Sequence, residues 1–272
     1  MSMESIVKSA RNLIKLLKSA DGIIDLSSEK FLCPIELLPL ASLISEESKK
    51  FICPENTKCA EYLKFFNFPQ GLTRFSARSD KYIPIYKFSA SRGDEKSLTD
   101  KSEILKNLIG ICLNKIGSPH GAVDALNIAI DEIISNIEDH SGAKFGWINA
   151  QYYPSKKFLE VCILDLGVTV ASRYKKVGKI FNSDPEALKN ALEGYSSKPE
   201  LIRGSGLPTF IKMITQGLGG EIIAVSGGAI AYASKRQGPL VRKISTNWEG
   251  MIVSFRIPRN LEPVDYALYI DQ

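Results

Sequence analysis

The sequence has no long apolar run, few cysteines and only two histidines, and each shortage excludes a class of protein. No apolar stretch approaches the roughly 20 residues that a membrane-spanning helix needs, and the N-terminus lacks a signal-peptide pattern. There is no run of five or more like charges, and the formal charge is only +5, which gives no indication of nucleic-acid binding. We therefore expect a cytoplasmic protein without a transmembrane segment and without a nucleic-acid partner.

The five cysteines are odd in number and widely scattered, which argues against a disulfide framework. Cys33 and Cys162 lie in apolar runs, so we expect buried free thiols in a reducing cytosol. The only close pair, Cys53 and Cys59, has no further cysteine or histidine at ligand spacing, so zinc binding is not expected.

The N-terminal third predicts a small α/β layer. Residues 3–18 place apolar side chains on one helical face and basic ones on the rest. Such a helix can lie on a membrane surface, but packing on its own domain or on a dimer partner is the favoured interpretation. After it, G-I-I-D-L and F-I-C read as strands that alternate with two helical stretches. The polar residues 86–102 suit an interdomain boundary, so we expect one domain over 1–90 and another over 103–265.

The second part predicts an α+β sandwich. Helices are expected at about 102–116 and 121–139, and strands at F-G-W-I-N-A-Q-Y-Y and K-F-L-E-V-C-I-L-D. A poorly periodic stretch runs from 168 to 204, followed by a helix at about 207–216. Three more strands are expected at G-G-E-I-I-A-V-S-G-G, A-I-A-Y-A-S and G-M-I-V-S-F-R-I-P. Helices grouped before hairpin-linked strands favour two layers, with helices on one face of a mixed, mostly antiparallel sheet.

The expected second helix of this part carries polar residues on an apolar background. Its sequence A-I-D-E-I-I-S-N-I-E-D-H-S-G sets Glu132 and Asn136 one turn apart, at the margin of the apolar face. A half-buried carboxylate is costly unless it is paired or used. On this helix alone, a glutamate that reaches solvent remains the simpler interpretation.

Two further motifs are each weak by themselves. The strand L-E-V-C-I-L-D-L-G ends at Asp165, followed by Gly167, and a strand-end aspartate often just begins a turn. R-G-S-G-L, from Arg203 to Leu207, precedes a helix, and its glycines would let backbone N–H groups approach an anion. A lone G-x-G is usually only a flexible turn.

In order and spacing, however, E-x-x-x-N, D-x-G and G-x-G-L together resemble the motifs of the GHKL ATPases, which include DNA gyrase, heat-shock chaperones, histidine kinases and MutL. The resemblance covers about residues 102–258 and implies a Bergerat-type ATP-binding fold. It implies ATP and Mg²⁺ as ligands, with Asn136 on the metal and Glu132 orienting or deprotonating the attacking water. Asp165 would accept the adenine amino proton, and Gly167 would let the backbone pass the base.

The remaining roles also follow from the resemblance. The 168–204 stretch would be the lid, with Lys198 near the phosphates as a catalytic cation, or else as a solvated loop lysine. The phosphates would meet the motif Gly204, Ser205, Gly206 and Leu207. Asp139, where histidine kinases usually carry a lysine, is more similar to the gyrase and MutL pattern and would join the nucleotide site. The usual second glycine of D-x-G-x-G is Thr169 here.

The N-terminal layer resembles the STAS domains, partners of anti-sigma-type kinases, over about residues 20–72. The position of their phosphorylated serine is occupied by C-P-I-E, which has no hydroxyl, so a regulatory or interaction role is expected. Three functions remain open: an ATP-hydrolysing switch acting through the STAS-like domain or a protein partner, an anti-sigma-type serine/threonine kinase, and a nucleotide-binding scaffold without turnover. The expected partner is another protein, and a homodimer is the alternative.

Overall fold

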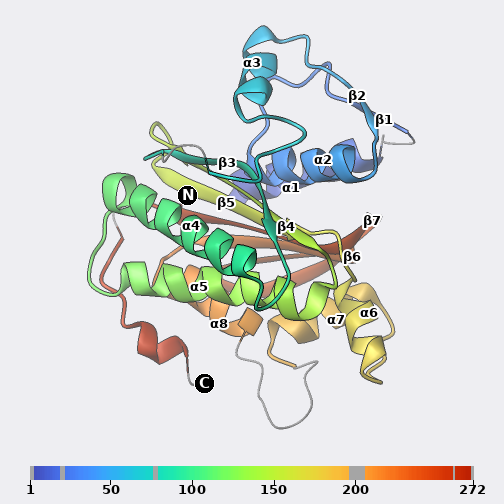
Figure 1. Ribbon diagram of the computed structural model, residues 1–272. Helices are drawn as coiled ribbons and strands as arrows, with labels where there is room; N and C mark the ends of the chain where they lie inside the picture. The colour runs from blue at the N-terminus through green and yellow to red at the C-terminus, as the bar shows by residue number, and fades with distance from the viewer. Residues whose placement is uncertain (1–2, 19–21, 76–78, 196–205, 260, 271–272) are drawn as a thin grey trace.

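A five-stranded antiparallel sheet forms the centre of the molecule in the computed structural model, which describes residues 3–18, 22–75, 79–195, 206–259 and 261–270 (Figure 1). The sheet has the order β3-β4-β5-β7-β6. Its strands are β3 (Tyr82–Ser89), β4 (Phe145–Tyr153), β5 (Phe158–Asp165), β6 (Glu221–Ser234) and β7 (Gln237–Pro258). Each neighbouring pair is antiparallel.

One face of the sheet is covered by α4 (Glu95–Ile111), α5 (Ala122–Asn136) and α8 (Gly206–Lys212). Each of these helices ends in a π-helical turn, at Cys112–Ile116, Ile137–Ser141 and Met213–Gly217 respectively. Because side chains alternate along a strand, Leu159, Val161 and Ile163 of β5 point into this helical layer. The expected α+β class, with helices packed on a largely antiparallel sheet, is confirmed.

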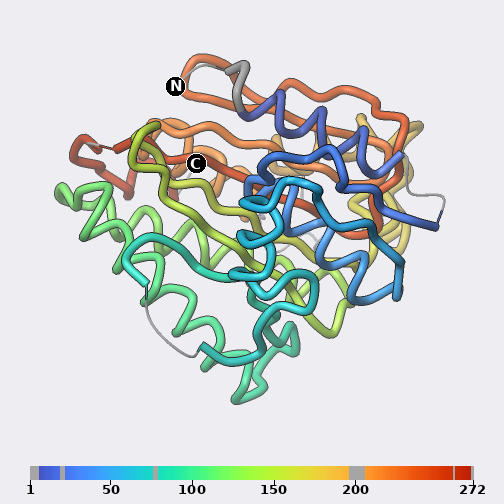
Figure 2. The backbone as a smooth tube through the Cα atoms, turned by 90° about the horizontal axis from the view of Figure 1, so that it is seen from above, coloured from blue at the N-terminus to red at the C-terminus, as the bar shows by residue number. Residues whose placement is uncertain are grey.

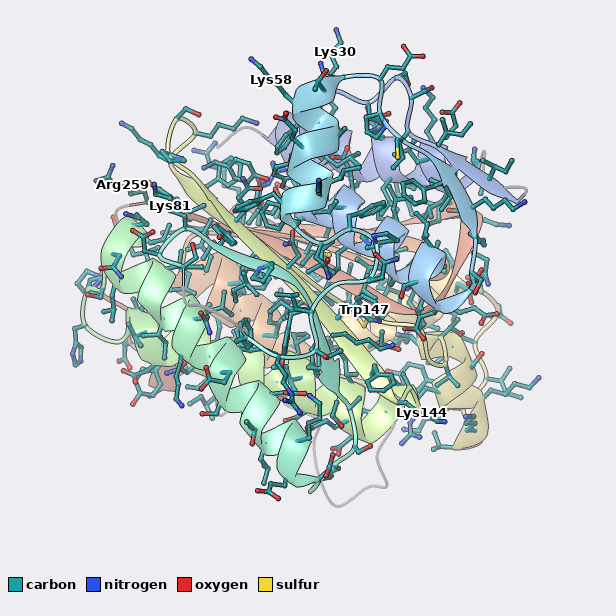
Figure 3. The ribbon with its side chains drawn as sticks, turned by 45° about the horizontal axis from the view of Figure 1, so that its top comes forward. Lys30, Lys58, Lys81, Lys144, Trp147 and Arg259 are labelled. Atoms are coloured by element: carbon teal, nitrogen blue, oxygen red, sulfur yellow. The ribbon has the colours of Figure 1, made fainter. Side chains whose placement is uncertain are left out.

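The N-terminal residues cover the opposite face of the same sheet (Figures 1 and 2). They form α1 (Met3–Lys18), α2 (Pro34–Glu46), α3 (Thr57–Phe65) and a parallel pair of short strands, β1 (Ile23–Asp25) and β2 (Lys50–Ile52). These are the alternating strands and helices that the sequence predicted. Together with Trp147 of β4, which is 1% exposed, they enclose a second apolar core (Figure 3).

The amphipathic helix α1 packs on its own chain. Ile6, Ala10 and Leu13 are almost fully buried, and the helix lies along the β6–β7 hairpin (Figure 2). Its apolar face is therefore covered, as the favoured interpretation held. No helix in the described part of the chain is long and apolar enough to cross a membrane.

The expected bounds of the last strands were wrong, and the polar stretch between the two expected domains contains regular elements. The polar stretch 86–102, interpreted as an interdomain boundary, contains the end of β3 and the start of α4, and β3 pairs with β4 as an edge strand of the main sheet. The two strands expected within 219–234 are one strand, β6, whose ladder is interrupted around Gly227. The last strand begins at Gln237, well before the expected glycine-methionine start. The division into two domains stays a prediction.

The segment expected to be irregular between 168 and 204 also contains helices. They are α6 (Val170–Lys176) and α7 (Asp184–Leu192), and α7 packs against β6 and β7. Ser183 caps α7 by accepting a hydrogen bond from the Glu186 N–H, and Pro185 stands in the first turn. The chain between β5 and α8 therefore contributes a helix that packs on the sheet. A 3₁₀-helix, Tyr266–Tyr269, follows β7.

Candidate functional site

The polar margin of α5 lines a cavity of about 270 Å³. Ala129, Ile130 and Ile133 bury the core side of the helix, whereas Glu132 and Asn136 are half-buried and face the cavity. The cavity is bounded by α5 and its π-helical turn, the end of β5, α6, the end of α7, the start of α8, and β7. Six segments of the chain therefore contribute residues to one cavity.

Asp165 reaches the same cavity from the end of β5. It pairs with Met251 of β7 and is 3% exposed. Its Oδ1 atom accepts a hydrogen bond of 2.8 Å from the Gly167 N–H. Burial raises the pKa of this carboxyl to about 7, against the opposing effect of the hydrogen bonds from the Gly167 and Met251 backbone. A carboxyl group poised in this way is a candidate for direct contact with a ligand.

The start of α8 is pressed against the α5 side chains. A β-carbon at Gly206 would lie 3.1 Å from Nδ2 and 3.2 Å from Oδ1 of Asn136, and 3.3 Å from Oε2 of Glu132. The Asn136 Nδ2 atom is buried and has no hydrogen-bond partner among the described residues. An unsatisfied buried amide is unfavourable, which makes Asn136 a group that a bound ligand would satisfy.

Two residues of the π-helical turn after α5, Asp139 and Ser141, contact other parts of the site. Asp139 lines the cavity and its Oδ1 atom accepts a 2.6 Å hydrogen bond from Nη1 of the mostly exposed Arg92. Sequence reasoning had not considered Arg92, which precedes α4. Gly167 lies directly against Ser141, since a β-carbon on the glycine would lie 2.1 Å from the Ser141 carbonyl oxygen. The Val168 N–H donates to that same oxygen at 2.8 Å.

The predicted phosphate-binding segment is only partly described. Gly206 and Leu207 line the cavity at the start of α8. Gly204, Ser205 and Lys198 lie outside the described residues. The structure thus brings Glu132, Asn136, Asp139, Asp165, Gly206 and Leu207 to one cavity, whereas Gly167 does not line it and instead lies against Ser141.

Several cavity residues come from the segment that had no predicted structure, and three of them carry polar or aromatic groups. Arg173 and Tyr174 belong to α6, and Tyr195 follows α7. The rings of Tyr174, Phe181 and Tyr195 cluster, with centroids 4.9 to 5.9 Å apart. The Arg173 Nε atom is buried without a hydrogen-bond partner in the described part of the chain. The positive charge of Arg173 would favour an anionic ligand in this cavity. No sequence motif had pointed to this arginine.

The described residues include no group of three or more His, Cys, Asp or Glu side chains arranged to hold a metal ion. Mg²⁺ is commonly bound by one or two protein oxygens together with water and substrate phosphates. Among the cavity groups, the Asn136 side-chain oxygen and the neighbouring Glu132 carboxylate are oxygen atoms that could hold such an ion.

No family model matches the chain, and no curated protein matches it either.

Proposed function

We propose that this chain is an ATP-binding protein of the GHKL type that hydrolyses ATP and acts as a regulatory switch. The observation that carries the proposal is the convergence of Glu132, Asn136 and Asp165 on one cavity, with Gly206 against the first two. These residues lie between positions 132 and 206 of the sequence, in three motifs that are each weak alone. Their meeting in space is what a shared nucleotide site requires.

The residues fit an adenine nucleotide with Mg²⁺. Asp165 is buried at the apolar end of the cavity, beside Ile163 and Met251, where a flat base would replace water. Its carboxylate would accept the hydrogen bond of the exocyclic amino group. Asn136 would turn its side-chain oxygen to the metal ion, and its amide nitrogen, which lacks a partner among the described residues, would donate a hydrogen bond to a phosphate oxygen. Arg173 would offset negative charge on the phosphates.

Glu132 is the candidate general base. It lies one helical turn before Asn136 on the same face of α5 and has its Oε2 atom beside Gly206, so it would face water held next to the terminal phosphate. Its role would be to orient that water and accept its proton. Bound Mg²⁺ would supply charge neutralisation on the transferred phosphoryl group. A site used only for binding needs no such base, which favours turnover.

The switch would act through the N-terminal STAS-like unit or through a protein partner. The strand that ends at Asp165 is also the strand on which the N-terminal helices pack, since alternate residues Phe158, Cys162 and Leu164 face them. Binding at one end of β5 is therefore directly connected to the face that carries α1 and α2. Because α6 and the end of α7 line the cavity, a nucleotide that shifts them would change the surface presented to a partner.

Calorimetric titration with Mg–ATP and a phosphate-release assay test the proposal. We expect Glu132→Ala to bind ATP but to release no phosphate, and Asp165→Asn to lose binding. The matched control is Asp131→Ala, which removes an exposed carboxylate on the neighbouring position of α5, ion-paired with Lys101, and should leave both activities unchanged. Unchanged ATP binding by Asp165→Asn would contradict the site. Transfer of labelled phosphate to another polypeptide in cell extract would instead favour the kinase.

A further inference from the structure

A second cavity, of about 630 Å³, lies on the opposite face of the sheet from the candidate nucleotide site. It is enclosed by α1, by the segment that leads into α2, and by the turn between β4 and β5. Cys33 and Glu36 of the C-P-I-E segment line it, whereas none of the proposed nucleotide-site residues does. Its floor is formed by Tyr153, Phe158, Glu160 and Arg256, all of which are buried.

The rim of this cavity is cationic. Lys8, Arg11 and Lys15 follow one another at single-turn spacing along α1, and Lys156 faces them from the β4–β5 turn. None of the four forms an ion pair with a residue in the described ranges. With Arg256, five cations line the cavity against two carboxylates.

Both carboxylates already have hydrogen-bond partners in the protein. Glu160 accepts from Arg256 Nε at 2.7 Å and from the Ile35 N–H at 3.2 Å. Glu36 accepts from the Cys33 N–H and from Asn12 Nδ2, each at 2.9 Å. Their charges therefore serve the packing of α2 on the sheet, and the four rim cations are left to attract an anion.

The Tyr153 hydroxyl is the group on the floor that lacks a partner. The residue is 9% exposed, its oxygen atom is buried, and no described residue hydrogen-bonds to it. A buried hydroxyl without a partner is unfavourable. Its ring packs against Phe158 and Phe31, with centroids 5.0 and 6.1 Å away. The floor thus offers aromatic surface together with one unused polar atom.

We propose that this cavity binds a small organic phosphate. The phosphate would lie between α1 and Lys156, the apolar body would cover Phe31 and Phe158, and a polar atom would reach the Tyr153 hydroxyl. The ligand would join α1 to the β4–β5 turn and so attach the N-terminal unit more firmly to the sheet. A phosphate of this kind can belong to a soluble metabolite or to a lipid headgroup.

Phenyl phosphate is a suitable first probe, titrated by calorimetry into the full chain, with inorganic phosphate as the comparison. We expect saturable binding of phenyl phosphate and about tenfold weaker binding of inorganic phosphate, which cannot use the aromatic floor. We expect Tyr153→Phe to weaken the binding of phenyl phosphate by about fivefold or more, because it removes a hydrogen bond. The double variant Lys8→Gln, Lys156→Gln should weaken it at least as much, because it removes two charges from the rim.

Lys58→Gln is the matched control, because Lys58 is exposed on α3 and points away from the body of the molecule (Figure 3). It should bind phenyl phosphate as the parent protein does. Thermal unfolding is measured for every variant, and Tyr153→Phe should be as stable as the parent, since it removes an unsatisfied hydroxyl. Absence of saturable binding, or equal binding by Tyr153→Phe, the double variant and the parent, would overturn the proposal.

Sedimentation with vesicles separates the two sources of phosphate. Phosphatidylcholine vesicles with and without phosphatidic acid are compared. Sedimentation that needs phosphatidic acid and is lost in the double variant would assign the site to a headgroup. Binding of phenyl phosphate without sedimentation would assign it to a soluble molecule. Neither result depends on ATP binding, so this proposal and the nucleotide site can fail separately.

Discussion

Gly206 and Asn136 are in such close contact that a β-carbon on the glycine would lie 3.1 Å from the asparagine amide nitrogen. Gly206 begins α8 and Asn136 ends α5, so the contact joins two of the three motifs. The same β-carbon would be 3.3 Å from Glu132. The glycine is therefore required by space around two functional side chains, and not by an unusual backbone angle.

Gly206→Ala should weaken ATP binding by about tenfold, which corresponds to about 1.4 kcal/mol. The added methyl group would force the Asn136 and Glu132 side chains to shift by a few tenths of an ångström and would occupy space in the cavity. Calorimetric titration measures the affinity. Gly110→Ala is the control, because a β-carbon at that α4 position meets nothing within 4 Å.

The control should keep its ATP affinity and gain about 0.5–1 kcal/mol of unfolding free energy, since alanine favours a helix over glycine. An ATP affinity of Gly206→Ala equal to that of the parent protein would contradict the proposed position of the nucleotide.

The buried carboxyl of Asp165 should make the protein less stable as the pH rises from about 4 to about 7. Its pKa is about 7 in the folded chain, against 3.8 for the ordinary side chain. In this range the folded state holds the proton that the unfolded state releases, so raising the pH favours unfolding. The loss approaches about 4 kcal/mol at most. Above pH 7 the contribution is constant.

Urea unfolding of the parent protein and Asp165→Asn from pH 4 to 8 measures this effect. The variant cannot ionise at this position, so its advantage over the parent should grow with pH and level off above 7. A difference between the two proteins that does not vary with pH would show that Asp165 titrates normally.

The sequence predicted the parts of the site that lie on strongly patterned elements. The apolar spacing around Glu132 and Asn136 predicted a helix with a polar margin, and the apolar run before Asp165 predicted a buried strand. Both occur as expected. In such elements, the side chains that face the core are decided by a periodicity that the sequence displays directly.

The missed elements have weaker local patterns. β3 contains Pro84, and its pairing register shifts between Ile83 and Tyr86. Proline disfavours a strand except at a sheet edge or an irregularity, and β3 has both features. The helices α6 and α7 are only seven and nine residues long, too short to display a clear period. Arg173 was missed for that reason, because tertiary packing alone brings it to the cavity.

Gly167→Ala should destabilise the protein by about 1–3 kcal/mol, the usual cost of overpacking. The new β-carbon would lie 2.1 Å from the Ser141 carbonyl oxygen, which already accepts the Val168 N–H. The turn after β5 would have to move away from the end of α5. Urea unfolding measures the cost.

Gly238→Ala provides the comparison, because a β-carbon there meets nothing within 4 Å. It should change the unfolding free energy by less than about 0.5 kcal/mol. Equal stabilities of the two variants would mean that the contact between Gly167 and Ser141 relaxes freely and does not hold the turn against the helix.

Arg256→Met should destabilise the protein by about 3–5 kcal/mol, because it leaves the Glu160 carboxylate buried without its cation. Glu160 and Arg256 are 0% and 3% exposed, and their 2.7 Å contact lies under α2. Glu160→Gln with Arg256→Met removes both charges of this pair and should recover part of the lost unfolding free energy, because the buried Glu221 carboxylate, 3.9 Å from the arginine, still loses its cation. Urea unfolding of the two single variants and the double variant measures the coupling. A double variant as unstable as Arg256→Met would show that the arginine acts through its packing on Phe158 and not through its charge.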